Sequence, residues 1–220
     1  AVIALLANTI AQKGLDSILS VVHFIFVLYL AIIAQFIIQL IALSVNGINP
    51  IVYMKKSLAL LILAFTSRSS VGCLPITIET LTQKLGVNQA TASFVAGFGT
   101  TAGMQGCAGI FPSLLIVYVC HLTGTVMDFS MIVMTIIVVT LGSLGIAGIP
   151  GTATMAASVG LSGVGMASSF SLIGPILAID PLIDMARTML NVSGSVTNAL
   201  IIDKRLGNLD ENIYNEINKN

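Results

Sequence analysis

Long runs without any charged side chain constrain this sequence more than any other feature. No Asp, Glu, Lys or Arg occurs in residues 17–54, 88–122 or 129–179. A helix needs about 20 mostly apolar residues to cross the hydrocarbon core of a bilayer. Charged residues make up 8% of the chain, whereas soluble domains contain about 25%. The sequence therefore predicts an all-α membrane protein with multi-pass helices.

Composition and spacing argue against several other classes of protein. The formal net charge is zero, so we expect no nucleic-acid partner. Cys73, Cys107 and Cys120 show no CxxC spacing and no clustering with His, which predicts buried apolar filler and no metal site. HExxH is absent and no His adjoins Ser69 or Ser70, so we expect neither an enzyme nor a bound cofactor.

Breaks in the apolar pattern divide the chain into helices and two hairpin-like segments. Gly, Pro, Ser and Thr cluster between short apolar arms at 66–75 and again at 145–152. Irregular backbone at membrane depth is tolerated only where it lines a cavity, so we predict two re-entrant helical hairpins, a pattern typical of secondary transporters. The expected segments are the end of a preceding transmembrane helix at 1–11, a transmembrane helix at 17–45, re-entrant hairpin 1 at 50–86, an interrupted transmembrane helix at 88–123, re-entrant hairpin 2 at 129–168, a last transmembrane helix at 172–203 and a cytoplasmic tail at 204–220.

The chain opens inside an apolar run that has no charged residue before it. A signal peptide would carry a basic n-region there, so we expect the C-terminal part of a larger protein. Basic residues set the expected orientation, since cytoplasmic loops are rich in Lys and Arg. Lys55, Lys56 and Lys84 flank the first hairpin, and Lys204 and Arg205 follow the last helix. We expect these flanks in the cytoplasm and the mouth of the second hairpin outside.

Glycines cluster between residues 97 and 109 of the interrupted helix. Each glycine weakens a helix by about 1 kcal/mol relative to alanine, so we predict that the helix unwinds here. Backbone carbonyls at Gly99, Thr101 and Gly103 are then candidates for coordinating a cation. Close packing of helices through small residues is the alternative.

An acid, a base and an amide lie at helical spacing in the last helix. Asp184 and Arg187 are three residues apart, and Arg187 and Asn191 are four apart, so all three share one face. Two ionised groups are costly to bury in so apolar a segment. We interpret them as a binding site in which Arg187 takes a carboxylate and Asp184 an ammonium group. An ion pair within the helix, with no ligand, is the alternative.

The chain carries three motifs, TSRSS (66–70), AGIPG (147–151) and DMARTMLNVSG (184–194), at matching order and spacing. They resemble the dicarboxylate/amino acid:cation symporters, which have the glutamate-transporter fold. The resemblance covers residues from about 18 to 204. It implies the C-terminal transport domain of that fold in a cell (plasma or inner) membrane, with membrane lipid around it and a homotrimer in the full-length protein.

The resemblance also implies roles for individual residues. Asp184 matches the carboxylate for the substrate amino group, Arg187 the guanidinium for a distal carboxylate, and Asn191 the amide near the α-carboxylate. The implied substrate-binding residues are Ser69, Ser70, Asp184, Arg187, Thr188 and Asn191. The implied extracellular gate is Gly148, Ile149, Pro150 and Gly151.

Two further stretches, GMQGCAGIFP (103–112) and NVSGS (191–195), are similar to the bacterial L-cystine uptake branch of the family. The resemblance therefore implies a secondary active symporter that imports an amino acid by alternating access, with L-cystine as the favoured substrate. Symport of aspartate, glutamate or a dicarboxylate is the alternative, and a channel or sensor on the same fold is a more remote one.

The coupling cation, sodium or proton, is left open by departures from the family pattern. Sodium-coupled members carry an Asn and an Asp in the unwound motif and a late Asp in the last helix. At those positions this chain has Gly103, Gln105 and Ser195. Hard cations favour anionic or carbonyl oxygens, so two of the family's sodium sites lack support. A site of carbonyls near Thr101 and the second hairpin is one remaining possibility, and a proton on Asp180 or Glu79 is another.

Overall fold

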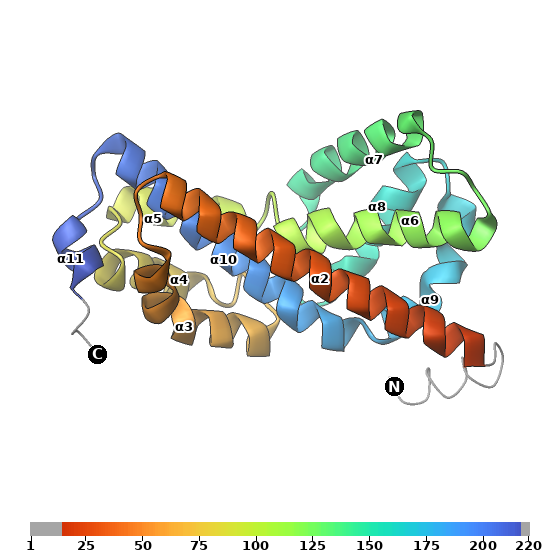
Figure 1. Cartoon of the computed structure of the whole chain (residues 1–220), viewed down its shortest axis with the longest axis horizontal. Helices are drawn as coiled ribbons and strands as arrows, with labels where there is room; N and C mark the ends of the chain where they lie inside the picture. The colour runs from red at the N-terminus through yellow and green to blue at the C-terminus, as the bar shows by residue number, and fades with distance from the viewer. Residues whose placement is uncertain (1–14, 217–220) are drawn as a thin grey trace.

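The computed structural model describes residues 15–216, and over that range the chain contains helices and no strand (Figure 1). The predicted transmembrane-helix end at 1–11 lies outside the described residues. Within the described residues, three helices are long and apolar enough to cross a membrane: Leu19–Val45, Pro50–Ser67 and Gln105–Thr123. A bent pair, Ala167–Ala178 with Asp180–Leu206, forms a fourth if it counts as one span. The predicted all-α membrane fold is confirmed.

The α-helices are α2 (Leu15–Val45), α3 (Pro50–Ser67), α4 (Leu74–Glu79), α5 (Gln89–Gly99), α6 (Phe111–Thr123), α7 (Phe129–Gly142), α8 (Ala153–Gly163), α9 (Gly174–Ala178), α10 (Asp180–Leu206) and α11 (Glu211–Asn215). Two short segments are π-helical, η1 (Thr80–Lys84) and η2 (Gln105–Ile110). Two others are 3-10 helices, η3 (Ser143–Gly145) and η4 (Ala167–Ile173).

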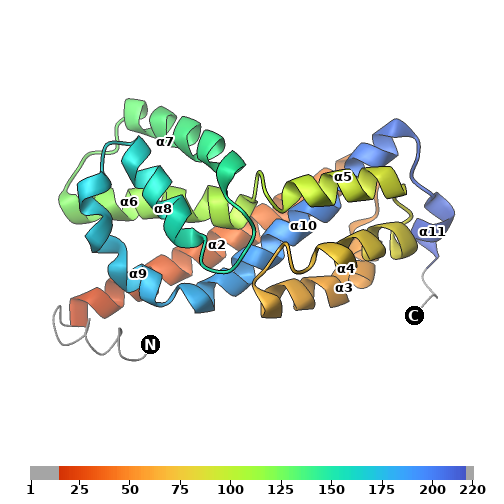
Figure 2. The same cartoon turned by 180° about the vertical axis from the view of Figure 1, so that it is seen from behind.

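Helices α2 and α10 run side by side along the molecule, and two groups of shorter helices pack against them (Figures 1 and 2). Helices α3, α4 and α5 lie at one end, and α6, α7 and α8 lie at the other. Each group forms its own hydrophobic core, and α10 contributes to both: Leu190 belongs to one core and Val192 to the other. Asn191 therefore lies where the two cores meet.

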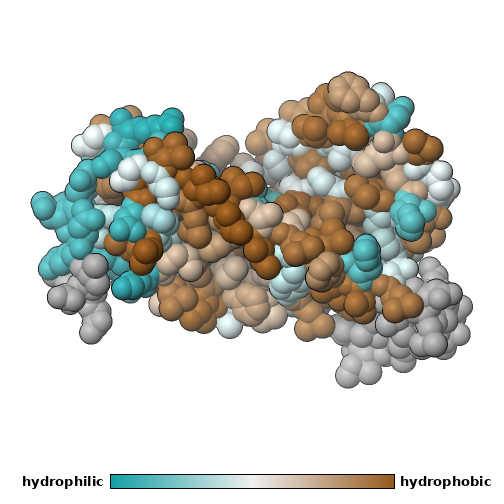
Figure 3. Space-filling model, in the orientation of Figure 1, coloured by the Kyte–Doolittle hydropathy of each residue, from teal (hydrophilic) through white to brown (hydrophobic). Residues whose placement is uncertain are grey.

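The outer surface is strongly apolar over much of its area. A band of hydrophobic side chains follows α2, while hydrophilic residues gather at the end that holds α11 (Figure 3). Leu19, Phe26, Ile33 and Val45 on α2 are all more than half exposed. Soluble monomers rarely expose apolar patches of this kind, so this surface is typical of a protein that spans a membrane.

The first predicted hairpin consists of α3, a tip at 68–73, and the returning α4 and η1. Asn49 caps α3 by accepting a hydrogen bond from the backbone N–H of Ile51, and Pro50 occupies its first turn. Proline suits that position because the N–H it lacks would have no helical partner there. The helix ends at Ser67, and the next residue, Arg68, has a φ of 55° that turns the chain into the tip.

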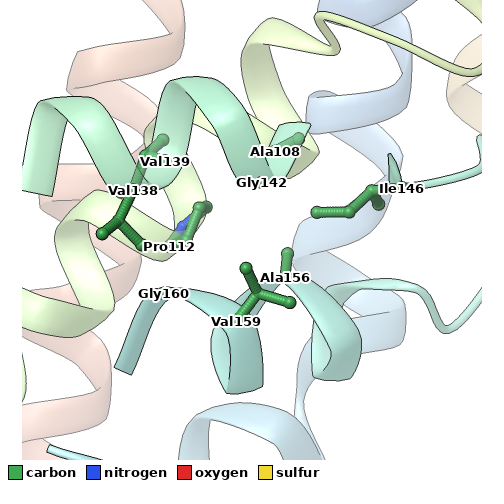
Figure 4. A pocket seen from close by; sticks show the side chains of 9 residues that line it. All are labelled: Ala108, Pro112, Val138, Val139, Gly142, Ile146, Ala156, Val159 and Gly160. Atoms are coloured by element: carbon green, nitrogen blue, oxygen red, sulfur yellow. The ribbon is translucent and has the colours of Figure 1, made fainter. Parts of the chain in front are cut away.

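The second predicted hairpin consists of α7, η3, a tip at 146–152, and α8. A dry apolar seam, which leaves no room for a water molecule, joins it to α6 (Figure 4). The residues that line the seam are Ala108, Pro112, Val138, Val139, Gly142, Ile146, Ala156, Val159 and Gly160. A Cβ atom at Gly142 would lie 2.7 Å from a methyl carbon of Val159, so glycine is what lets the two arms approach.

The last segment differs from the single helix expected at 172–203. The chain forms η4 and α9 first, and α10 then starts at Asp180 after a bend of 86°. Pro175 and Pro181 lie in the first turns of α9 and α10, and a proline starts a helix but cannot continue the preceding one. Asp184 consequently lies in the second turn of α10 and not near a helix centre.

Candidate functional site

Arg187 lies at the centre of a buried polar cluster on α10. Its guanidinium has no solvent exposure, and Nη2 donates to Asp180 Oδ1 at 2.5 Å and to Asp184 Oδ1 at 3.1 Å. The guanidinium carbon lies 3.9 Å from the centre of the Phe111 ring. Its Nε and Nη1 have no hydrogen-bond partner among the described residues. Buried donors are nearly always paired, so these two groups are free to bind the acceptor atoms of a ligand.

The helical period brings these side chains together. Asp180, Asp184, Arg187 and Asn191 are separated by four, three and four residues, so they form one stripe along α10. We predicted three of them as substrate-binding residues and considered Asp180 only as a proton carrier. The spacing that linked the other three also reaches Asp180 one turn earlier, so the signal for its place in the cluster was present in the sequence.

Asn191 holds the π-helical segment η2 against α10. Its Oδ1 accepts hydrogen bonds from the backbone N–H groups of Gly106, at 2.8 Å, and Cys107, at 3.4 Å. Its Nδ2 donates to Cys107 Sγ at 3.0 Å, and that thiol lies 3.5 Å from Asp184 Oδ1. The expectation of apolar filler is wrong for Cys107, because its thiol joins two polar side chains of the cluster.

The two hairpin tips and the unwound segment meet at Gly148. Its N–H donates to Thr100 O at 2.7 Å, and its carbonyl accepts from Val71 N at 3.1 Å and from Ser69 Oγ at 3.4 Å. A Cβ atom at Gly148 would lie 2.7 Å from Thr100 O and 2.9 Å from Ser70 Cβ. Only glycine fits so close an approach. Tip 1 is also tied to the start of α10, since Arg68 Nη1 donates to Pro181 O at 3.1 Å.

The other predicted site residues divide into buried and exposed groups. Thr188 and Ser70 are buried, at 2% and 4% exposure. Ile149, Pro150 and Gly151 are exposed, so Gly148 is the residue of the predicted gate that makes the contact between the tips.

The helix predicted at 88–123 is interrupted at the glycine cluster, as expected. Helix α5 ends at Gly99, and Gly103 has a φ of 71°. A cavity of about 260 Å³ opens beside this break. Its lining residues are Phe94, Val95, Phe98, Gly99, Ala102, Gly103, Gln105, Asn191, Gly194, Ser195, Asn198 and Ile202. Thr101 is exposed and does not line it. The cavity offers backbone, hydroxyl and amide groups but no carboxylate.

Comparison with known proteins agrees with this architecture. Residues 1–205 match the sodium:dicarboxylate symporter family. The chain is 42% identical over 216 residues to an L-cystine uptake protein, TcyP, from Bacillus cereus, covering 98% of this chain and 46% of that protein. It is 41% identical over 216 residues to TcyP from Bacillus licheniformis, with the same coverage, and 39% identical over 219 residues to TcyP from Shouchella clausii, covering 99% and 46%.

The chain thus spans about half the length of the curated relatives that it matches. The match to the family includes the three motifs at 66–70, 147–151 and 184–194, and the helices are those of a multi-pass protein of the cell membrane. The chain belongs to the sodium:dicarboxylate symporter family.

Proposed function

We propose that the protein to which this chain belongs imports an amino acid by secondary active symport, with L-cystine as the favoured substrate. The observation that carries the proposal is the buried guanidinium of Arg187, which keeps two donors unpaired beside Asp180 and Asp184. Relatives at 39–42% identity are named as L-cystine uptake proteins. Because the chain spans 46% of those relatives, the activity proposed is that of the whole protein.

The cluster suits a zwitterion that has a second acidic end. The unpaired Nε and Nη1 of Arg187 lie on different edges of the planar guanidinium, so each can donate a hydrogen bond to a carboxylate oxygen of the substrate. Asp184 accepts the ammonium group, and Asn191 can turn its Nδ2 from the Cys107 thiol to the α-carboxylate. Cystine carries two amino-acid ends, so its far carboxylate reaches Arg187. Without a substrate, the two aspartates hold the arginine in place and neutralise its charge.

Access to this cluster is controlled where the hairpin tips meet. The hydrogen bonds at Gly148 join tip 2 to Thr100 and to Val71 of tip 1. Breaking them would separate the tips and expose Ser69 and Ser70 to a substrate. We propose that residues 148–151 form this gate, and that the transport domain alternates access within a homotrimer of the full-length protein.

The coupling cation is sodium or a proton. Gly99, Gly103 and Ser195 line the 260 Å³ cavity, which makes it the candidate place for sodium. Asp180 is the candidate proton carrier, because it lies in the cluster and shares Arg187 with Asp184. Uptake into vesicles with sodium and proton gradients imposed separately distinguishes the two.

Radiolabelled cystine uptake by the full-length protein tests the proposal. We expect Arg187→Ala and Asp184→Ala each to abolish uptake while leaving the amount of protein in the membrane unchanged. Arg205→Ala, at an exposed position on the same helix, is the matched control and should transport normally. Normal uptake in both Arg187→Ala and Asp184→Ala would overturn the proposal.

An acidic amino acid is the second candidate substrate, since the same guanidinium would bind the side-chain carboxylate of aspartate or glutamate. Excess unlabelled aspartate decides between them, because it competes with labelled cystine only if the site accepts both. Substrate-independent current in the full-length protein would instead indicate a channel.

A further inference from the structure

A buried network of neutral polar side chains lies behind the substrate cluster, and the transport mechanism above does not use it. Gln39, on α2, is 4% exposed and stands at its centre. Its Nε2 donates to Gln105 Oε1 at 2.6 Å and to Leu190 O at 3.4 Å, and its Oε1 accepts from Ser193 Oγ at 2.5 Å. Ser193 also bonds to the hydroxyl of Tyr53 on α3, at 2.7 Å. The amide of Gln39 thus ties α2 to η2 and α10, and Ser193 extends the network to α3.

The partners of Gln39 surround one particular residue. Leu190 precedes Asn191 directly, and Ser193 follows it by two positions. Gln105 directly precedes Gly106, whose N–H donates to Asn191 Oδ1. Gln39 therefore bonds to both elements that meet at Asn191: to Gln105 on η2, and to Leu190 and Ser193 on α10.

Close packing leaves the network little freedom. A Cβ atom at Gly194 would lie 3.1 Å from the amide carbon of Gln105, so the absence of a side chain there lets this amide lie against α10. Ser193 and Tyr53 have no solvent exposure. Water therefore cannot replace the bond between Gln39 and Ser193, and we expect loss of Gln39 to be taken up by movement of η2 relative to α10.

We infer that Gln39 is a positioning residue for the substrate site, one that sets the register of η2 against α10 and thereby the orientation of the Asn191 amide. The inference rests on the proposed function, because the consequence it predicts is a change in the affinity for the substrate. Gln39 itself lies behind the cluster and acts through Gln105, Leu190 and Ser193.

The adjacent glutamine supplies a matched control. Gln35 lies one helical turn before Gln39 and donates to the same oxygen, Gln105 Oε1, at 3.1 Å. Among the described residues, Gln35 hydrogen-bonds only to η2, whereas Gln39 bonds to η2 and to α10. A substitution at Gln35 therefore removes an amide from the same network without releasing α10.

The experiment compares Gln39→Leu with Gln35→Leu in the full-length protein. For Gln39→Leu we expect the KM for cystine uptake to rise about tenfold, as loss of a buried hydrogen-bonding group would give, with Vmax per transporter nearly unchanged. Gln35→Leu should keep the wild-type KM. Ser193→Ala removes one bond of Gln39 and should give an intermediate KM, which keeps the test open if Gln39→Leu fails to reach the membrane.

Gln39→Glu adds a second measurement, the pH dependence of the KM, which would not change if the role of Gln39 were purely structural. A protonated glutamic acid can donate to Gln105 Oε1 and accept from Ser193, but a carboxylate has no hydrogen to donate. Relative to wild type at each pH, the KM of Gln39→Glu should fall toward the normal value as the pH is lowered, while that of Gln39→Leu should not change.

Hydrogen–deuterium exchange tests the positioning without any transport. We expect faster exchange of the amides of Gly106 and Cys107 in Gln39→Leu and wild-type exchange in Gln35→Leu. If wild-type protein fails to transport cystine, the proposed function is wrong but this result still decides the inference. Unchanged KM and unchanged exchange in Gln39→Leu, or equal effects at Gln35 and Gln39, would overturn it.

Discussion

Gly106 shows how a single residue can determine the geometry of the buried polar cluster around Arg187. A Cβ atom there would lie 2.7 Å from the carbonyl oxygen of Arg187 and 2.9 Å from its Cα atom. These are backbone atoms of a buried helix, so they cannot move aside as the end of a flexible side chain would. The absence of a side chain at this position is what lets η2 reach the Asn191 amide.

Gly106→Ala should therefore damage the site and its neighbour Gly109→Ala should not. Overpacking of this kind costs about 1–3 kcal/mol, and here the strain falls on Arg187 itself. A Cβ atom at Gly109 would meet only the carbonyl of Met104, at 3.9 Å. Cystine uptake and the melting temperature of the purified protein check this prediction. Equal behaviour of the two variants would contradict it.

At the scale of elements, the two hairpins differ in how they are held. Helix α3 buries six side chains, Val52, Tyr53, Ser57, Leu60, Leu61 and Ala64, and packs against α10. Helix α7 buries Thr135 alone among its residues, and its arm depends on the apolar seam with α6 and α8. Helix α7 is thus the less buried of these two arms, which favours the second hairpin as the moving gate.

Gly148→Ala should open the contact between the tips. The added methyl group would meet Thr100 O at 2.7 Å, whereas Gly145→Ala, the control on the same hairpin, has nothing within 4 Å. The measurement is labelling by a membrane-impermeant maleimide of full-length protein that carries Ser70→Cys, a position that is 4% exposed in the closed arrangement. We expect faster labelling with Gly148→Ala and no change with Gly145→Ala. Equal labelling rates in both would refute the role of Gly148.

For the molecule as a whole, the C-terminal segment fastens the base of the first hairpin. Asp210 N donates to Gly86 O at 2.9 Å, and Lys56 Nζ donates to Lys84 O at 2.8 Å and to Ile213 O at 2.5 Å. Tyr214, 3% exposed, donates its hydroxyl to Asn49 O at 2.8 Å. Burial raises the pKa of Tyr214, so the hydroxyl remains a donor at neutral pH. The tail therefore joins both arms of the hairpin.

Lys56→Ala should loosen this fastening, and Lys55→Ala should leave it intact. The two lysines are adjacent, but Lys55 is exposed, and surface substitutions usually change stability by less than about 0.5 kcal/mol. We expect a lower melting temperature and faster amide exchange at 84–88 and 210–215 for Lys56→Ala, with little change in the affinity for cystine. Identical exchange in the two variants would show that the tail does not brace the hairpin.

The sequence by itself determined the class of fold and placed three residues of the buried polar cluster on one helix. The uncharged runs required helices, and the spacing of Asp184, Arg187 and Asn191 required a shared helical face, because both properties depend on local periodicity and on the cost of burying charge. The unwinding near Gly99 and Gly103 was predictable for the same reason, since glycine weakens a helix locally.

Only the tertiary structure decided what those residues contact. Gln39 and Gln105 are 66 positions apart, and nothing in local periodicity brings them together. The meeting of Thr100, Val71 and Gly148, and the thiol of Cys107 between Asp184 and Asn191, likewise depend on how distant helices pack. The bend before Asp180 was misjudged because an apolar run indicates burial without indicating direction, and direction is set by Pro181 and by the two cores that meet on α10.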